Sequence, residues 1–208
     1  MTEVRNAGPG RSGAAGSAAA QRIRDAAIES FAEHGYAGTS TRQITARLNM
    51  SAAAMYPHFR SKEELLYSIA LEGHHQVNDA IAAVDDPAGT YRDRLRLVVA
   101  AFAGWQAEHH ALARVVQYEM RALTPDHFRV IAGLRREITA RLDEIVRGGA
   151  ETGEFTVDDA DDAVLAISSL CVDVCRWFPS RAHRDPVALG QAYARTAERI
   201  VGGSARSG

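Results

Sequence analysis

Residues 48–65, LNMSAAAMYPHFRSKEEL, contain the pattern that decides the fold. A short helix is expected before this stretch, over 41–48, and the stretch itself predicts a second short helix over 51–58. The residues at 48–50 must reverse the chain, and Asn49 tolerates the left-handed backbone conformation that such a turn requires. Two short helices joined by a turn of three or four residues are typical of a helix-turn-helix unit.

Capping signals mark where the helices around this unit begin. A capping box is expected at 40–43, where serine is followed three residues later by glutamine. A second box is expected at 61–64, and it would open a long helix over 62–82. Ser51 is placed to cap the second short helix.

The second short helix of such a unit enters the major groove of DNA, with its N-terminal residues near the base edges. Alanines at 52–54 let the backbone approach closely, and their methyl groups suit thymine methyl groups. We expect Tyr56 and His58 to bind phosphates. Lys62 would bind a further phosphate at the start of the long helix, and Arg42 would read a guanine. The candidate DNA contacts are Thr41, Arg42, Ser51, Ala52, Ala53, Ala54, Tyr56, Pro57, His58 and Lys62.

The rest of the chain is expected to be helical as well. Apolar residues recur at helical spacing, and period-two alternation is absent over any useful length. Pro87, Pro125 and Pro186 each lie just inside an expected helix start. The last two helices are expected over 158–178 and 185–202. The sequence therefore predicts an all-α fold of about nine helices.

The expected organisation is a small helix-turn-helix head of three helices, residues 17–62, on a larger helical body, residues 63–203. The Gly-rich residues 1–16 lack periodicity and are expected to form a disordered tail, with a second tail at 204–208. Residues 1–62 carry eight Lys/Arg against four Asp/Glu, in a chain whose net charge is -2. A basic head on an acidic body suits a protein that meets a polyanion at one end only.

Two cysteines, Cys171 and Cys175, lie four residues apart in an apolar helical pattern. At this spacing the Cβ atoms are about 5–6 Å apart, which is too far for a relaxed disulfide. We interpret both as core thiols of a reducing compartment. The longest apolar run, 97–105, is far too short for a membrane span, and the first 20 residues lack the apolar region of a signal peptide. The sequence predicts a soluble cytoplasmic protein without a cofactor.

Four motifs at fixed spacing surround the helix-turn-helix pattern: FAEHGY at 31–36, TSTRQI at 39–44, SAAAMYPHF at 51–59 and SKEEL at 61–65. Together they resemble the N-terminal domain of the TetR family of repressors. The chain departs from the family pattern at five positions, so that the polar side chains usually used to read bases are missing. These positions are Thr45, Asn49, Ala52, Ala53 and Pro57.

The resemblance implies a ligand-responsive repressor that binds double-stranded DNA. The helices at 158–178 and 185–202 would pack against those of a second copy, and the resulting homodimer would bind a palindromic operator. The middle helices would enclose a cavity for a small hydrophobic effector. The candidate pocket residues are Phe102, Trp105, Tyr118, Arg121, Phe128, Leu134, Cys171 and Trp177.

The last third of the chain is also similar to family members that respond to acyl-CoA esters. The similar features are Trp177-Phe178 near a helix end and the turn at 151–155. An acyl-CoA effector would bring phosphates that arginine side chains can bind in a bidentate manner. The candidate arginines are Arg121, Arg135 and Arg136.

Three alternatives stay open on the sequence alone. The bulky residues of the middle helices can be plain core instead of a pocket. The protein can also bind DNA constitutively, or under the control of a partner, without a small-molecule effector. A more distant alternative is a helical metalloenzyme, because Glu72 and His75 have the Glu-x-x-His spacing of di-iron bundles. Such sites need a second pair of this kind, and no other glutamate in the chain provides one.

Overall fold

The computed structural model describes residues 10–202, and the side chains from residue 18 onward. This part of the chain contains no strand, which confirms the predicted all-α class. It folds into eight α-helices and two short 3-10 helices, against about nine helices expected. The elements are α1 (Gly10–Gly38), α2 (Thr41–Ala46), η1 (Ala52–Met55), α3 (Lys62–Ala82), α4 (Tyr91–Glu108), α5 (His110–Tyr118), η2 (Met120–Ala122), α6 (Pro125–Glu151), α7 (Ala160–Trp177) and α8 (Pro186–Val201).

The two tails expected from the sequence lie mostly outside the described residues. Residues 1–9 and 203–208 are the ones that the structure does not describe. Helix α1 begins at Gly10, so residues 10–16 are helical in the structure, where the sequence predicted disorder.

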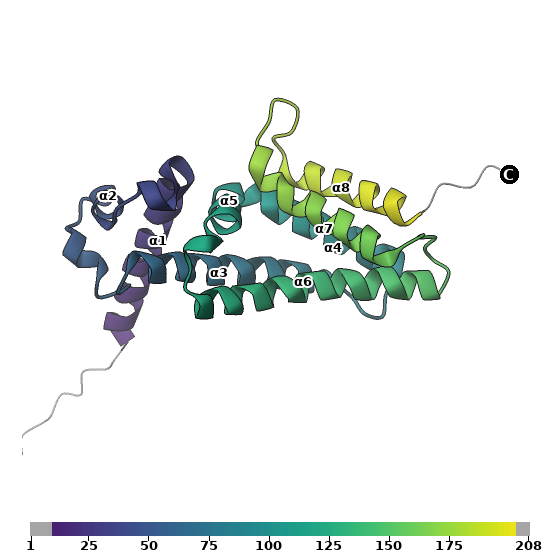
Figure 1. Ribbon diagram of the computed structural model, residues 1–208, viewed down its shortest axis with the longest axis horizontal. Helices are drawn as coiled ribbons and strands as arrows, with labels where there is room; N and C mark the ends of the chain where they lie inside the picture. Colours follow the sequence, from purple (N-terminus) through teal and green to yellow (C-terminus); the bar gives the residue numbers. More distant parts are fainter. Residues whose placement is uncertain (1–9, 203–208) are drawn as a thin grey trace, which may run out of the picture.

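The head, formed by α1, α2 and η1, lies at one end of the molecule (Figure 1). Helix α3 leads from the head straight into the body, where it runs beside α6, and α5 lies between the head and the rest of the body (Figure 1). Helices α4, α7 and α8 pack together at the other end. Only two residues separate Phe59 from the start of α3. A movement of α3 is therefore transmitted to the head.

Two groups of buried side chains hold these elements together. The body core joins α4, α6, α7 and α8 with the end of α3. The head core joins the head to the first half of α3 and to three elements of the body, α5, η2 and α6. Its buried members are Ile23, Ala26, Ala27, Phe31, Ile44, Met55, Phe59, Leu65, Leu66, Ile69, Ala70, Val115, Val116, Met120, Leu123 and Ile131. The head therefore packs directly on the body.

Most helix starts follow the capping signals in the sequence. The capping box of Ser40 and Gln43 is present in full. At Ser61 only half of the predicted box forms, because the Glu64 carboxylate accepts from Arg60 N instead, at 2.7 Å. Proline stands in the first turn of α6 and of α8, as expected. The prediction for Pro87 is wrong, since α4 begins only at Tyr91.

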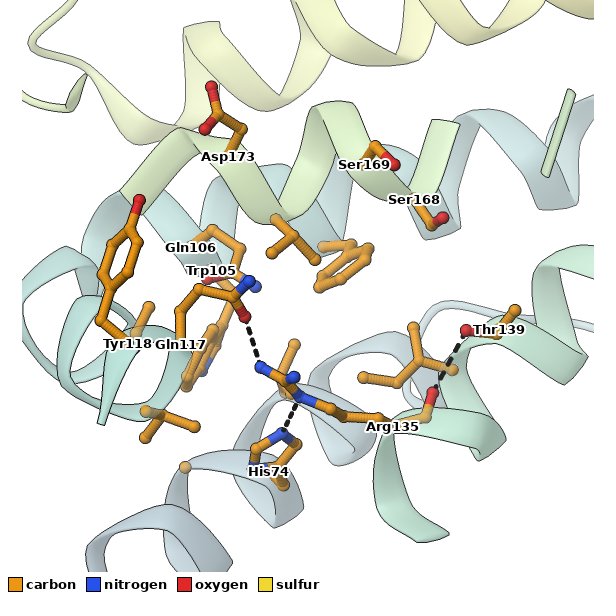
Figure 2. A pocket seen from close by; sticks show the side chains of 17 residues that line it. His74, Trp105, Gln106, Gln117, Tyr118, Arg135, Thr139, Ser168, Ser169 and Asp173 are labelled. Atoms are coloured by element: carbon orange, nitrogen blue, oxygen red, sulfur yellow. Dashed lines mark hydrogen bonds between the residues drawn. The ribbon is translucent and has the colours of Figure 1, made fainter. Parts of the chain in front are cut away.

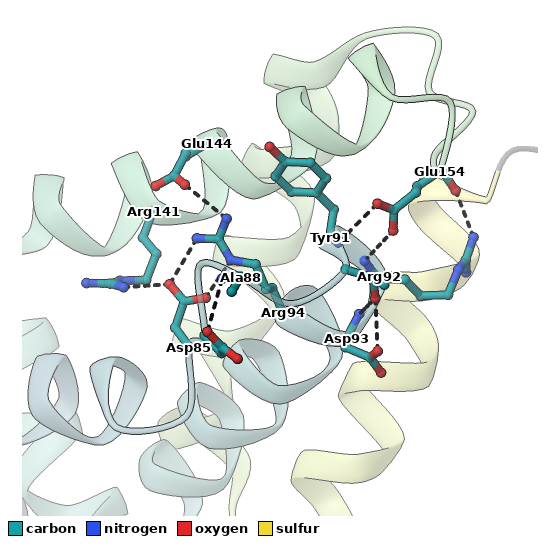
Figure 3. Close-up of polar contacts among 11 residues, drawn as sticks. Asp85, Ala88, Tyr91, Arg92, Asp93, Arg94, Arg141, Glu144 and Glu154 are labelled. Atoms are coloured by element: carbon teal, nitrogen blue, oxygen red, sulfur yellow. Dashed lines mark hydrogen bonds and ion pairs between the residues drawn. The ribbon is translucent and has the colours of Figure 1, made fainter.

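A buried ion-pair network ties the loop after α3 to α4 and α6 (Figure 3). The Asp85 carboxylate, fully buried, accepts from Arg94 Nε at 2.7 Å and from Arg141 Nη1 at 2.6 Å. Arg94 also reaches Glu144, at 3.0 Å from Nη1 to Oε1. The Arg94 hydrogen bond is the main cause that lowers the pKa of Asp85. The far end of α3 is thereby fixed to the body by charges that satisfy one another.

Candidate DNA-binding surface and effector cavity

The structure contains the helix-turn-helix unit predicted from the sequence. Helix α2 ends in a turn whose Asn49 has a φ of 55°, the left-handed conformation expected there. Leu48 N and Met50 N both donate to Thr45 O at 3.0 Å, which closes the turn. Ile44 and Met55 are fully buried in the head core on the two sides of the turn.

Thr45 is one of the departures from the family pattern, and the structure explains how it is accommodated. The residue is fully buried. Its hydroxyl donates to the carbonyl of Thr41 at 3.1 Å, one helical turn earlier. Because the buried hydroxyl has a partner, a threonine fits here without the cost of an unsatisfied polar group.

The predicted second helix, 51–58, is shorter and tighter than expected. Only Ala52–Met55 form a helix, and it is of the 3-10 type. Pro57 explains this difference, because it has no N–H to donate to the carbonyl four residues earlier. That carbonyl, Ala53 O, accepts instead from Tyr56 N at 3.3 Å. The prediction that Ser51 caps this helix is wrong, since its side chain makes no capping hydrogen bond.

The candidate DNA contacts around η1 lie on the outer surface of the head. Tyr56 is 55% exposed although it is a large aromatic side chain. Arg42, Ser51, Ala53 and Pro57 are exposed as well. Four further candidates, Thr41, Ala52, Ala54 and His58, are half-buried. These nine exposed or half-buried residues of α2, η1 and the residues beside η1 are here called the recognition surface.

Lys62 was expected to bind a phosphate, and in the structure its ammonium group has backbone partners. Its Nζ donates to the carbonyls of Tyr36 and Thr39, at 2.8 Å each. The same ammonium lies 4.1 Å from the centroid of the Tyr36 ring, in cation–π geometry. Lys62 therefore fastens the end of α1 to the start of α3. No spacing rule in the sequence indicated these two carbonyls as partners.

A cavity of about 520 Å³ opens between the middle helices of the body (Figure 2). Pockets of about 300–1,000 Å³ accept drug-sized ligands. The walls come from α3, α4, α5, α6 and α7, and both apolar and polar residues line them. The lining residues are Gly73, His74, Val77, Phe102, Trp105, Gln106, Ala113, Val116, Gln117, Tyr118, Arg135, Ile138, Thr139, Ser168, Ser169, Val172 and Asp173.

Of the eight pocket residues expected from the sequence, Phe102, Trp105 and Tyr118 line this cavity. The other five lie elsewhere, which corrects the expectation. Cys171 is fully buried in the body core, and Leu134 packs against the head core. Phe128 is 46% exposed and Arg121 is exposed, while Trp177 makes edge-to-face contacts with Phe178 and His183.

Arg135 carries the only arginine or lysine side chain on the cavity wall, and two neutral groups hold it (Figure 2). Its Nε donates to His74 Nε2 at 3.3 Å, and its Nη2 donates to Gln117 Oε1. His74 Nδ1 lies 2.7 Å from Ala70 O. Burial is the main cause that lowers the pKa of His74 to about 4. His74 is thus neutral near pH 7, with the proton on Nδ1 and an acceptor on Nε2.

The sequence named Arg135 as one of three possible phosphate ligands, but it missed both residues that hold it. His74 and Gln117 stand 61 and 18 residues away in the chain. Burial also lowers the pKa of Arg135. Arg136, the next residue, is exposed and does not line the cavity.

The residues behind the metalloenzyme alternative have other partners. Glu72 forms an ion pair with Arg24, at 2.7 Å from Oε2 to Nε, and His75 is exposed. Among the described residues no group of three or more His, Cys, Asp and Glu is placed to hold a metal ion. Cys171 and Cys175 are free and buried, and burial raises the pKa of Cys171 to about 12. Within residues 10–202 no helix is long and apolar enough to cross a membrane.

Comparison with known proteins gives the family. The pattern described as "Bacterial regulatory proteins, tetR family" matches residues 23–69, and "Tetracyclin repressor-like, C-terminal domain" matches residues 88–201. A crystal structure of a tetR-family regulatory protein from Rhodococcus RHA1 is 50% identical, with a TM-score of 0.85, and covers 88% of this chain and 97% of that one.

Two further relatives concern fatty acids or their CoA esters. The fatty acid metabolism regulator protein of Bacillus subtilis is 26% identical over 175 residues, which cover 82% of this chain and 89% of that protein. The structure of FadR from Bacillus subtilis in complex with stearoyl-CoA is 24% identical, with a TM-score of 0.67, and covers 87% of this chain and 98% of that one. The chain belongs to the TetR family of ligand-responsive, DNA-binding transcriptional regulators.

Proposed function

We propose that this chain represses transcription as a homodimer on a palindromic operator and leaves that operator when a small acyl compound occupies the cavity. The observation that carries the proposal is the position of α5. One side of this helix contributes Val116 and Gln117 to the cavity wall. The same helix packs on α1, and Val116 is also a member of the head core. A ligand that moves α5 therefore also moves the head.

The mechanism follows from two-state population shift. Helices α3 and α5 both line the cavity and both contact the head. An effector that binds one arrangement of these helices more tightly than the other favours that arrangement, and only in proportion to this difference in affinity. The two heads of a dimer would then no longer fit half-sites spaced one helical turn, about 34–36 Å, apart.

The recognition surface is proposed to lie in the major groove. Its alanine methyl groups would contact thymine methyl groups, and exposed Arg42 would reach a guanine. Tyr56 and His58 would bind phosphates and fix the register. Because few polar side chains of η1 are left to read bases, DNA shape would contribute part of the specificity.

The dimer is proposed to form through α7 and α8. Large apolar side chains on these two helices remain exposed in the single chain, namely Leu165 at 65%, Leu170 at 41% and Val187 at 68%. Pairing the same two helices of a second copy would bury them in a four-helix bundle.

The proposed effector class is based on the cavity and on the two relatives described above. A cavity of about 520 Å³ with apolar residues such as Phe102 and Ile138 suits a hydrocarbon chain. One relative is a fatty acid metabolism regulator, and another was crystallised with stearoyl-CoA. We infer that the effector is an acyl compound, either a free acid or a CoA ester, and that the protein acts through binding and not through catalysis.

Selection of bound sequences from random DNA tests this function. The purified protein should select a palindrome, and an acyl compound added to the selection should abolish it. Selection of no defined sequence would contradict the DNA-binding role. Selection of a palindrome that no acid or CoA ester weakens would contradict the effector role and favour a constitutive or partner-controlled regulator.

A further inference from the structure

The charge on the cavity wall identifies the polar group of the effector. Two charged side chains line the cavity, Arg135 and Asp173. The Asp173 carboxylate already forms two hydrogen bonds with Arg176, at 2.7 Å and 2.8 Å. Within the part of the chain that the structure describes, no carboxylate forms an ion pair with Arg135. The wall therefore carries one positive charge without a counter-charge.

The donors of Arg135 that remain free have the geometry of a carboxylate site. A guanidinium has five N–H groups in one plane. His74 takes the Nε hydrogen and Gln117 takes one Nη2 hydrogen. Both Nη1 hydrogens and one Nη2 hydrogen remain, and such a pair of neighbouring nitrogens matches the two oxygens of a carboxylate. Figure 2 shows this guanidinium at the centre of the lining residues.

We propose that Arg135 binds the carboxylate of the effector, so that the effector is a free amphipathic acid whose chain lies among Phe102, Val116 and Ile138. This inference rests on the proposed function and names its ligand. A partly buried cation is costly unless an anion compensates it. A carboxylate supplies that charge inside the cavity, whereas the carbonyl of a CoA ester or the hydroxyl of an alcohol is neutral.

The same contact links ligand binding to the head. Arg135 belongs to α6, while its two holders belong to α3 and α5. These are the two helices that line the cavity and also contact the head. A carboxylate that pairs with the free donors of Arg135 is joined through the guanidinium to His74 and Gln117. It thereby acts on both helices at once.

Titration calorimetry of the full-length protein with four probes that share a ten-carbon chain tests the inference: decanoate, 1-decanol, methyl decanoate and decanoyl-CoA. Chain lengths from hexanoate to hexadecanoate are included so that the chain fits the cavity. The acid of best length should bind about tenfold or more tightly than the matched alcohol and ester, because a charge-assisted pair replaces a neutral contact. Arg135→Gln should remove this preference, and Arg135→Lys should keep part of it.

Arg136→Gln is the matched control, because this neighbouring arginine is exposed and lies outside the cavity wall. It should leave the acid preference unchanged. Equal affinity for acid and alcohol would overturn the inference, as would an acid preference that survives Arg135→Gln or is lost in Arg136→Gln. Failure of every acid to bind, or tighter binding of decanoyl-CoA with no dependence on Arg135, would overturn it as well.

Operator affinity measured in parallel separates this inference from the proposed function. If decanoyl-CoA or decanol releases the operator without need of Arg135, the carboxylate inference fails and the effector-controlled function stands. If decanoate binds through Arg135 but leaves operator affinity unchanged, the ligand is correct and the regulatory function fails.

Discussion

Arg94 and Arg135 are two arginines enclosed in the same helical body, and their surroundings are opposite. Arg94 is only 4% exposed and lies between two carboxylates, those of Asp85 and Glu144 (Figure 3). Arg135 lies on a cavity wall between a neutral imidazole and a neutral amide. The first arginine has its counter-charge within the chain, so its role is to hold helices together. The second has donors and charge left over, which is the condition of a group that binds something else.

The largest effect is expected from Arg94→Met, which removes the charge and keeps much of the apolar stem. Asp85 would stay fully buried with Arg141 as its remaining cationic partner. Breaking a buried ion pair by removing one partner costs about 3–5 kcal/mol. Urea denaturation followed by circular dichroism should show a loss of this size. Glu144→Gln is the control, and since Glu144 is 63% exposed it should cost less than about 1 kcal/mol.

His74, which accepts a hydrogen bond from Arg135, should give the second largest effect, as a dependence of the free energy of unfolding on pH. Burial lowers the pKa of His74 from 6.5 to about 4 in the folded chain. The unfolded chain therefore takes up this proton first as the pH falls. The contribution of neutral His74 to the free energy of unfolding is present in full above pH 6.5 and is lost as the pH falls from 6.5 to 4. The total loss is about 3 kcal/mol.

The free energy of unfolding of the wild-type protein and of His74→Gln, measured from pH 7 to pH 4, checks this prediction. The variant should lack this part of the pH dependence, whereas His75→Gln should retain it, because His75 is exposed. Parallel curves for the wild type and His74→Gln would contradict a neutral His74. The contrast between Arg94, held by charges, and Arg135, held by neutral groups, would then be lost.

The head and the cavity also differ in how far the sequence predicts them. The helix-turn-helix unit depends on neighbours close in the chain: Ser40 with Gln43, and Asn49 in the turn. Such local rules predicted the unit, the long α3 and the starts of α6 and α8. They did not predict the 3-10 geometry of η1, which the structure relates to the hydrogen bond that Pro57 removes from Ala53 O.

The cavity depends on residues far apart in the chain, and local rules do not reach it. Cys171 and Leu134 were expected to line the pocket, yet Cys171 belongs to the body core and Leu134 packs against the head core. A cavity forms where helices diverge, and the polar residues that meet there come from α3, α5 and α6. His74 lies 61 residues from Arg135 in the chain, and only the packing of α3 against α6 brings the two side chains together.

Arg42 extends the comparison to the surface, since it is an exposed arginine on the recognition surface whose proposed partner is a base. Arg42→Ala should weaken operator binding by about 1–3 kcal/mol and relax the preference at one base position. Tyr56→Phe should weaken binding evenly across sequences, because it removes a phosphate contact. Binding to a library of single-base operator variants measures both effects. An even loss in the Arg42 variant would contradict its role in base reading.

The smallest effect is expected from Arg135→Met, the exact counterpart of the Arg94 variant. Removal of the Arg135 guanidinium leaves no buried carboxylate unpaired. Water in the cavity can bind His74 Nε2 and Gln117 Oε1 in place of the guanidinium. It also removes a charge whose desolvation opposes folding. The free energy of unfolding should change by less than about 1 kcal/mol, as is usual where no buried partner is orphaned. If Arg135→Met lowered the free energy of unfolding as much as Arg94→Met, Arg135 would be a residue needed for the folded structure and not a group kept for a ligand. A small change, together with a lost preference for acids, would separate binding from folding at this position.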